Sequence, residues 1–264
     1  AVKPQQMREV ALGIAPFVAG RLVISIAAGI RARDLSRWLG GHRRIVRCMP
    51  NTPALIGAGI TGLAAMPGLD AADRDAAQSV LAAVGETLWV DDEAGLDAVT
   101  AVSGSGPAYV FYFMEAMHRA ARELGLDDAQ ARSLTQATFA GAARLAAGSD
   151  EPPSVLRERV TSKGGTTAAA LAVMGERGVA AHIVEALGAA CRRSAELGDE
   201  FGARLAHECA PHYGADLWTY AVADDAGPGV TVAARDLHLS ADGSTFTLEC
   251  PRLALRAPVR LRLA

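Results

Sequence analysis

Apolar runs and helical patterns alternate over residues 1–92. Three short runs, rich in β-branched and small apolar residues, predict strands at residues 23–26, 44–49 and 59–64. Apolar positions at helical spacing predict helices at residues 34–39 and 71–84. Strands that alternate with helices at this interval indicate an α/β fold with a mainly parallel sheet.

Two segments of small or polar residues follow the first two predicted strands. They are Ala27-Ala28-Gly29 and Met49-Pro50-Asn51-Thr52. Because ligands bind beyond the carboxyl ends of parallel strands, both segments are candidate ligand-facing turns. No Gly-x-Gly-x-x-Gly fingerprint follows a strand here. The nearest fragment, Gly104–Tyr109, has tyrosine in place of the third glycine and proline at a helix start.

Residues 93–202 are predicted to be almost entirely helical. The first helix follows Ser105 and Pro107, which suit a helix start, and it ends at Gly125. A second begins at Asp127 and runs to about Ala147. Further helices are expected at residues 153–159, 166–175 and 179–198. Several long helices with little sheet provide a surface for pairing with a second subunit.

Residues 203–264 change to a β-rich pattern. Strands are predicted at residues 217–222, 230–239 and 244–249, with a hairpin turn at Asp242-Gly243. The expected division of the chain is therefore 1–92, 93–202 and 203–264.

Composition and charge argue against several classes of protein. Half of the 264 residues are hydrophobic, 21% are charged, and the formal net charge is -3, so nothing indicates nucleic acid as a partner. No apolar run reaches the roughly 18 residues that a membrane-spanning helix needs, which argues against a membrane partner. The four cysteines are far apart and form no C-x-x-C pair, which is typical of reduced cytoplasmic proteins.

A cluster of metal-ligand residue types occurs in His207-Glu208-Cys209-Ala210-Pro211-His212. Its spacing matches no standard zinc pattern, and the proline breaks a helical face. We therefore expect two ordinary loop histidines and no metal site.

The loop Val160–Thr167 is the most informative candidate for a ligand site. Gly164 and Gly165 allow a tight turn and close approach of the backbone. The helix predicted to follow would point unpaired N–H groups into the turn. Hydroxyls of Ser162 and of the two following threonines add donors, so the loop suits a carboxylate or a phosphate. From spacing alone, a capped helix start with flexible glycines is an equal alternative.

Five motifs occur in the order found in pyrroline-5-carboxylate reductase, and the chain resembles this family from residue 1 to about 202. The motifs are Ala1–Gln5, Val23–Ile30, Met49–Pro53, Ala101–Tyr109 and Val160–Thr167. The resemblance implies a partial Rossmann-like, dinucleotide-binding α/β domain at 1–92, followed by an all-α dimerisation and substrate domain at 93–202. The implied reaction is reduction of 1-pyrroline-5-carboxylate to L-proline by hydride transfer from NADPH or NADH, the last step of proline biosynthesis. The implied assembly is a homodimer or higher homo-oligomer.

The resemblance also implies roles for particular residues. Those on the nicotinamide side of the cofactor would be Lys3, Pro4, Ala27 and Asn51. Those around the substrate would be Ser103, Gly104, Gly106, Ser162, Gly164, Gly165 and Thr166. Thr167 aligns with the family threonine that hydrogen-bonds the ring nitrogen. Lys163 stands where many members have proline, and its charge would favour an acidic substrate. Such a reaction needs positioning of two reactants and no strong nucleophile or metal.

The chain departs from the family pattern at both ends. It begins without Met, and the family's glycine-rich phosphate loop would lie upstream of Lys3, so we expect a piece of a longer protein that binds NADPH weakly by itself. The alternative function is a non-catalytic helical dimerisation module with a β appendage.

The tail, residues 203–264, resembles part of the central domain of a Mur ligase of the tripeptide-synthetase type. The resembling stretches are 217–220, 232–237 and 240–248, and they include no ATP-binding loop, so ligase activity is not implied. A generic β-hairpin module is the alternative for this tail.

Overall fold

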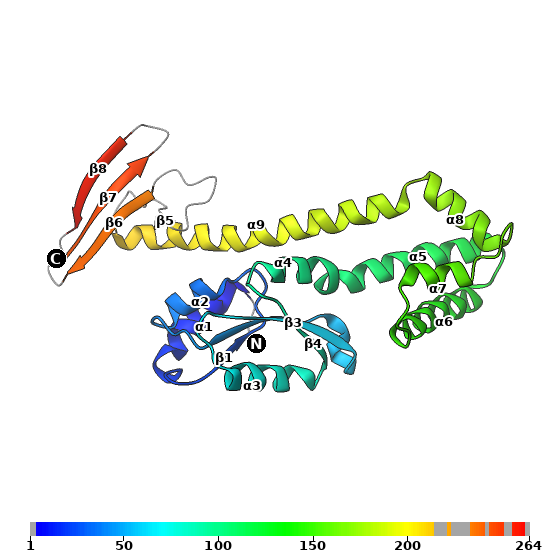
Figure 1. The fold of residues 1–264 in the computed structure, drawn as a ribbon, viewed down its shortest axis with the longest axis horizontal. Helices are drawn as coiled ribbons and strands as arrows, with labels where there is room; N and C mark the ends of the chain where they lie inside the picture. Colours follow the sequence, from blue (N-terminus) through cyan, green and yellow to red (C-terminus); the bar gives the residue numbers. More distant parts are fainter. Residues whose placement is uncertain (1–3, 214–220, 223–232, 241–242, 251–254, 262–264) are drawn as a thin grey trace. The chain divides into compact units, whose positions relative to one another are not determined.

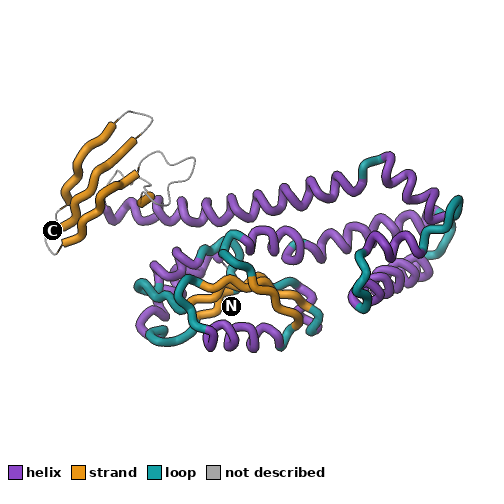
Figure 2. Tube along the Cα trace, in the orientation of Figure 1, coloured by secondary structure: helices purple, strands orange, loops and turns teal. Residues whose placement is uncertain are grey.

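A computed structural model describes residues 4–213, 221–222, 233–240, 243–250 and 255–261 of the chain. The chain divides into two compact units, Ala1–Gly198 and Asp199–Ala264. Strands are confined to two regions of the described chain, and the segment that joins them is helical (Figure 2). Among the helices of these residues, none is both long and apolar enough to cross a membrane. The finer three-part division expected from the sequence stays a prediction.

In the first unit, residues 23–89 contain a four-stranded mixed sheet (Figure 1). Its strands, in spatial order, are β1 (Val23–Ser25), β2 (Ile45–Met49), β3 (Gly59–Ala65) and β4 (Gly85–Trp89). The outer pairs, β1 with β2 and β3 with β4, are parallel, whereas β2 and β3 are antiparallel. The segment between β2 and β3 holds only the short η3 (Thr52–Ile56), which is too short for a parallel crossover.

Helices cover this sheet on both faces. They are η1 (Pro4–Gln6), α1 (Met7–Ile14), η2 (Ala15–Phe17), α2 (Ala32–Trp38) and α3 (Ala71–Ala82). Side chains of β2 alternate between the faces: Val46 and Cys48 pack against α3, where Ala77 and Leu81 complete the buried cluster. Arg47 therefore points to the opposite face and is also buried, 6% exposed.

The helical part begins directly after β4. It consists of α4 (Gly95–Val99), the π-helical turn η4 (Thr100–Gly104), α5 (Gly106–Glu123), α6 (Asp128–Ala147), α7 (Pro153–Arg159), α8 (Thr166–Glu176) and α9 (Val179–Tyr213). Asp127 caps α6 in a capping box with Gln130, as the start predicted at this position requires. The helices from α5 to α8 agree closely with the sequence prediction, whereas α4 and η4 precede the first helix that we predicted and the end of α9 differs.

The last helix is longer than the sequence predicts. We expected it to stop at Gly198, but α9 continues to Tyr213 because isolated glycines, here Gly198 and Gly202, do not break a helix when many of the other residues are helix formers. The expectation of loop histidines at His207 and His212 is therefore wrong, since the backbone of both lies in α9. Their side chains lie outside the described residues, and metal binding there stays untested.

The second unit contains a separate four-stranded sheet. It consists of β5 (Ala221–Val222), β6 (Ala233–Ser240), β7 (Gly243–Cys250) and β8 (Leu255–Leu261), in that order. β6 and β7 are antiparallel with Ser240 opposite Gly243, in agreement with the predicted hairpin. The predicted strand at 217–222 lies outside the described residues except for its last two positions, and Asp242 of the predicted turn also lies outside them.

Candidate active site

The turn after β1 brings small residues to the carboxyl edge of the sheet. Ala27 is 4% exposed, and its N–H donates to the Ser25 hydroxyl at 3.4 Å. Gly29 has a φ of 73°, a left-handed conformation that a larger residue adopts only with strain. Pro4 begins η1 and is partly buried. Lys3 lies outside the described residues, so its predicted place beside the cofactor is untested.

The turn after β2 holds Asn51 at the same edge. The Asn51 side-chain oxygen accepts a hydrogen bond from the Ile60 N–H at 3.0 Å, which fixes the amide. A ligand at this edge would therefore meet the NH2 group of Asn51, which is a donor. Because β1 and β2 are parallel neighbours, the turns that carry Ala27 and Asn51 follow adjacent strand ends.

The π-helical turn η4 packs directly against the end of β2. A Cβ atom added at Gly104 would lie 2.7 Å from the Met49 methyl carbon, so a larger residue there would have to displace the end of the Met49 side chain. The Thr100 hydroxyl donates to the Leu96 carbonyl at 2.7 Å, and the Ser103 hydroxyl donates to the Val99 carbonyl at 3.0 Å. Ser103 can therefore accept a bond from a ligand as it stands and must rotate to donate one. π-Helical turns of this kind are frequent at functional sites.

The loop between α7 and α8 has the geometry of an anion site. Gly164 has a φ of 72°, and the Gly165 N–H donates to the Ser162 carbonyl at 3.0 Å. Gly165 is the N-cap of α8, and no described side chain caps this helix end. A Cβ at Gly165 would collide with the Ser162 hydroxyl, which therefore lies beside the helix start. Uncapped N–H groups favour an anion-binding loop over a side-chain-capped helix start.

The predicted site residues fall into two groups within one chain. Ala27, Asn51 and Gly104 lie around the carboxyl edge of the first sheet. The Ser162–Thr167 loop lies at the other end of the helical part, beyond α5 (Figure 1). The 18 residues of α5 alone span about 27 Å. Gly106, at the start of α5, has open space where its side chain would be. One chain thus does not bring its own loop to its own sheet edge.

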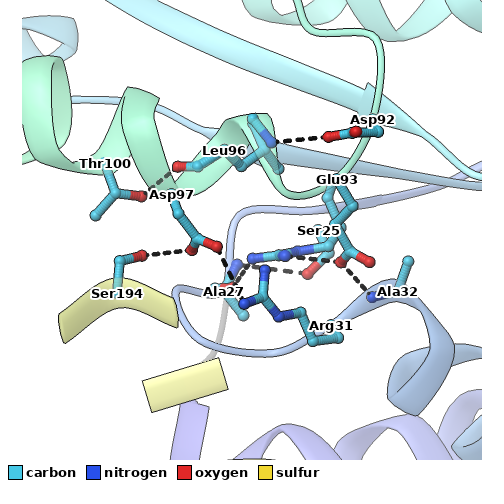
Figure 3. Close-up of polar contacts among 12 residues, drawn as sticks. Ser25, Ala27, Arg31, Ala32, Asp92, Glu93, Leu96, Asp97, Thr100 and Ser194 are labelled. Carbon is cyan, nitrogen blue, oxygen red and sulfur yellow. Dashed lines mark hydrogen bonds and ion pairs between the residues drawn. The ribbon is translucent and has the colours of Figure 1, made fainter. Parts of the chain in front are cut away.

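A network of charged side chains surrounds the Ala27 turn, and sequence analysis did not find it (Figure 3). Arg47 Nη1 pairs with Glu93 Oε1 at 2.7 Å, and Arg47 Nη2 donates to the Ala27 carbonyl at 3.4 Å. The same Glu93 oxygen accepts from the Ala32 N–H at 2.6 Å. Arg31 Nη2 pairs with Asp97 Oδ2 at 3.1 Å. An arginine inside the predicted buried strand 44–49 was the signal that could have revealed it.

Two further titratable groups in this region are buried. Desolvation raises the pKa of the Cys48 thiol to about 12, so Cys48 is protonated and a poor nucleophile at neutral pH. Desolvation also raises the pKa of Asp34, against the lowering effect of Arg37, whose guanidinium lies 3.2 Å away. Among the described residues, no hydrogen bond or ion pair joins either group to the Ala27 turn, and we assign neither to the chemistry.

A sheet edge lined by small residues and a separate helical region define the class of an α/β ligand-binding domain joined to a helical domain. Residues 93–197 match the family described as "Pyrroline-5-carboxylate reductase dimerisation". The chain is 50% identical over 203 residues to a pyrroline-5-carboxylate reductase of Pseudomonas aeruginosa, covering 76% of this chain and 74% of that protein. It is 46% identical over 199 residues to that of Haemophilus influenzae, covering 75% and 73%. The chain belongs to the pyrroline-5-carboxylate reductase family.

Solved structures agree with this assignment. The pyrroline-5-carboxylate reductase of Coxiella burnetii superposes with a TM-score of 0.72 at 42% identity, over 75% of this chain and 74% of that one. The Plasmodium falciparum pyrroline carboxylate reductase with NADP bound has a TM-score of 0.68 at 31% identity, over 75% and 80%. These matches confirm the α/β and helical parts of the predicted fold. They do not extend to the Mur ligase resemblance, which stays a prediction.

Proposed function

We propose that this chain reduces 1-pyrroline-5-carboxylate to L-proline with NAD(P)H, as one subunit of a homodimer or higher homo-oligomer in the cytoplasm. The observation that carries the proposal is the uncapped start of α8 at the Gly164-Gly165 turn, which offers N–H and hydroxyl donors to a carboxylate. Family membership supplies the reaction. The assigned partners are therefore small molecules, with no role for nucleic acid.

The donor chemistry of the sheet edge supports a nicotinamide at this position. Ala27 and Gly29 have no bulky side chain that would block a flat ring, and the Asn51 NH2 group can donate to a carboxamide oxygen. Pro4 and Lys3 are assigned to the ribose side on the family resemblance. When bound, the cofactor supplies a hydride. The relative from Plasmodium falciparum, whose structure holds NADP, supports NADP as the cofactor, with NAD as the alternative.

The loop between α7 and α8 would hold the substrate. Ser162, Gly164, Gly165 and Thr166 bind the carboxylate through N–H and hydroxyl donors, and the hydroxyl of Thr167 meets the ring nitrogen. In the reaction the C=N carbon gains a hydride and its nitrogen gains a proton, which Thr167 can relay from solvent. Ser103, Gly104 and Gly106 shape the opposite wall. No group needs to become a covalent nucleophile, so holding the two reactants in line is the main task of the chain.

The separation of the two groups implies that a second subunit completes each site. α5, α7 and α8 contain no buried residue, although α5 alone is 18 residues long. Large apolar side chains of the helical part are exposed: Phe111, Tyr112, Leu134, Leu145, Val173, Met174 and Val184. Such an uncovered apolar surface requires a partner, and the family's dimerisation region coincides with it. In the proposed dimer, the loop of one subunit reaches the sheet edge of the other.

Mixed dimers test this arrangement. Asn51→Asp keeps an acceptor for the Ile60 N–H but loses the NH2 group and adds a charge at the sheet edge. Gly165→Val forces a side chain against Ser162 in the loop. Each variant alone should lose about tenfold or more of the rate of NADPH oxidation. Co-expressed with different tags and purified as a mixed dimer, the two should recover half of the unsubstituted rate, because one site of the two is intact.

Other outcomes would contradict parts of the proposal. An active unsubstituted chain whose mixed dimers stay inactive would mean that each site is built from one subunit. Dimers that neither oxidise NADPH nor gain thermal stability from L-proline would instead be the non-catalytic dimerisation module.

A further inference from the structure

The side chain of Arg31 connects the cofactor turn to the last helix of the first unit. Arg31 precedes α2, four residues after Ala27, and its guanidinium pairs with Asp97 on α4 at 3.1 Å. Both side chains are only 14% exposed, so solvent screens this pair less than a surface pair. The second oxygen of Asp97 accepts from the Ser194 hydroxyl of α9 at 2.7 Å. Figure 3 shows Asp97 between Arg31 and Ser194.

A glycine of α9 makes room for the same guanidinium. A Cβ atom at Gly198 would lie 2.5 Å from Arg31 Nε and 2.8 Å from the carbon at the centre of the guanidinium. Gly198 is buried, and it lies one turn after Ser194 on the same face of α9. α9 therefore holds Arg31 through two contacts: Ser194 orients the carboxylate that Arg31 pairs with, and Gly198 leaves the space that it fills.

Asp97 also lies next to the pocket wall. α4 continues without a break into η4, where Ser103 and Gly104 lie. Asp97, which lies on the segment that leads into the pocket, thus contacts both Arg31, after the β1 turn, and Ser194 of α9. A shift of α9 would move Arg31 and, with it, the backbone that follows Ala27.

We propose that Arg31 and Asp97 are positioning residues for the cofactor turn, and that α9 sets this position through Ser194 and Gly198. The effect on cofactor binding rests on the proposed function, because it requires Ala27 to face the nicotinamide. The consequence is that the helix which continues from the dimerisation region controls the geometry of the cofactor turn without touching either reactant.

Gly198→Ala is the test variant, and Gly188→Ala is its matched control. Both place a methyl group on α9, but at Gly188 the nearest atom is Arg192 Nη1 at 3.4 Å, an ordinary contact. Hydrogen exchange of the backbone at residues 27–33, measured without ligand, reports the turn directly. We expect Gly198→Ala to raise this exchange and the Kd for NADPH roughly fivefold, as loss of one part-buried contact would. Gly188→Ala should change neither, and Ser194→Ala, which only removes an atom, should act in the same direction as Gly198→Ala.

A double substitution separates positioning from general loosening. If α9 acts through Arg31, Gly198→Ala should have no further effect in an Arg31→Ala chain, because the colliding side chain is gone. Additive effects, unchanged exchange at 27–33, or faster exchange with an unchanged Kd would each overturn the inference. If the unsubstituted chain itself fails to bind NADPH, the proposed function and the cofactor part of the inference are overturned. Hydrogen exchange without ligand still decides the coupling in that case.

Discussion

Truncation of Glu93 should destabilise the chain far more than removal of its partner, Arg47. Glu93→Ala takes away the acceptor of the Ala32 N–H, at 2.6 Å, and leaves the Arg47 guanidinium without its counter-charge. The Arg47 side chain is 7% exposed, and its Nε already has no partner among the described residues. Breaking a buried pair costs about 3–5 kcal/mol, and because Glu93 is itself 30% exposed we expect the lower end, about 3 kcal/mol.

The reverse substitution should be mild. Arg47→Met removes a buried charge together with its desolvation cost, and it leaves Glu93 partly solvated and still bonded to Ala32. We expect a loss of about 1 kcal/mol, in line with apolar replacement of buried ion pairs. Arg47→Met combined with Glu93→Gln should therefore be more stable than Glu93→Ala alone, although it carries two changes instead of one.

Urea unfolding at neutral pH and one fixed subunit concentration measures these differences. With a slope of about 2–3 kcal/mol/M, a 3 kcal/mol loss lowers the midpoint by about 1 M. A loss below about 1 kcal/mol for Glu93→Ala, or a larger loss for Arg47→Met than for Glu93→Ala, would refute the argument. The first result would mean that water reaches Arg47 freely once the carboxylate is removed, and the second that the contacts of Arg47 outweigh its desolvation cost.

Two further predictions concern the sheet and the helix α3 that packs on it. The hydrogen bonds from Arg44, at 2.6 and 2.9 Å, lower the pKa of Asp73, so its stabilisation is present above the ordinary pKa of 3.8 and is lost as the pH falls through the lower folded-state pKa. The unsubstituted chain should therefore lose stability below about pH 4 more steeply than Asp73→Asn does, and parallel curves of urea midpoint against pH would contradict this. Gly85→Ala should cost on the order of 3 kcal/mol or prevent folding, because the φ of Gly85 is 142° and a Cβ there would overlap the Gly59 carbonyl. Gly13→Ala, in open space on α1, is the control and should leave the thermal midpoint unchanged or slightly raised; similar midpoints for the two variants would exclude strain at Gly85.

The sequence predicts most of the fold because local signals determine most of its elements. The β-branched run at 23–26 contains β1. Asp127 caps α6, and Pro153 is the first residue of α7. β4 is missed because Gly85–Trp89 begins with a glycine and carries a glutamate, which weaken the strand signal, so only its pairing with β3 makes it a strand. The end of α9 is missed because a glycine is a weak stop when helix formers follow it.

The candidate site is predictable only in part, for a different reason. The two adjacent glycines, Gly164 and Gly165, predict a tight turn from the sequence alone, and the structure adds that no described side chain caps the helix that follows. Arg31 and Asp97 carry no such signal, because 66 residues separate them and isolated charges are usually solvated. Only the fold brings them together, and only the fold reveals that the loop lies far from the sheet edge of its own chain.

The segment from Glu93 to Gly104 explains how the proposed reaction can proceed with few catalytic groups. Glu93 holds the start of α2, Asp97 holds Arg31 and Ser194, and Gly104 lies against Met49 at the end of β2. Each contact reaches a different element around the same edge of the sheet, so the pocket wall cannot move without breaking a charged contact or a close packing contact. A reaction that needs two reactants held in line, and little else, gains its rate from such rigidity. Arg31, Arg47, Glu93 and Asp97 thus lie around the proposed reaction centre, where they fix its backbone, and the centre itself is left to small residues and hydroxyls.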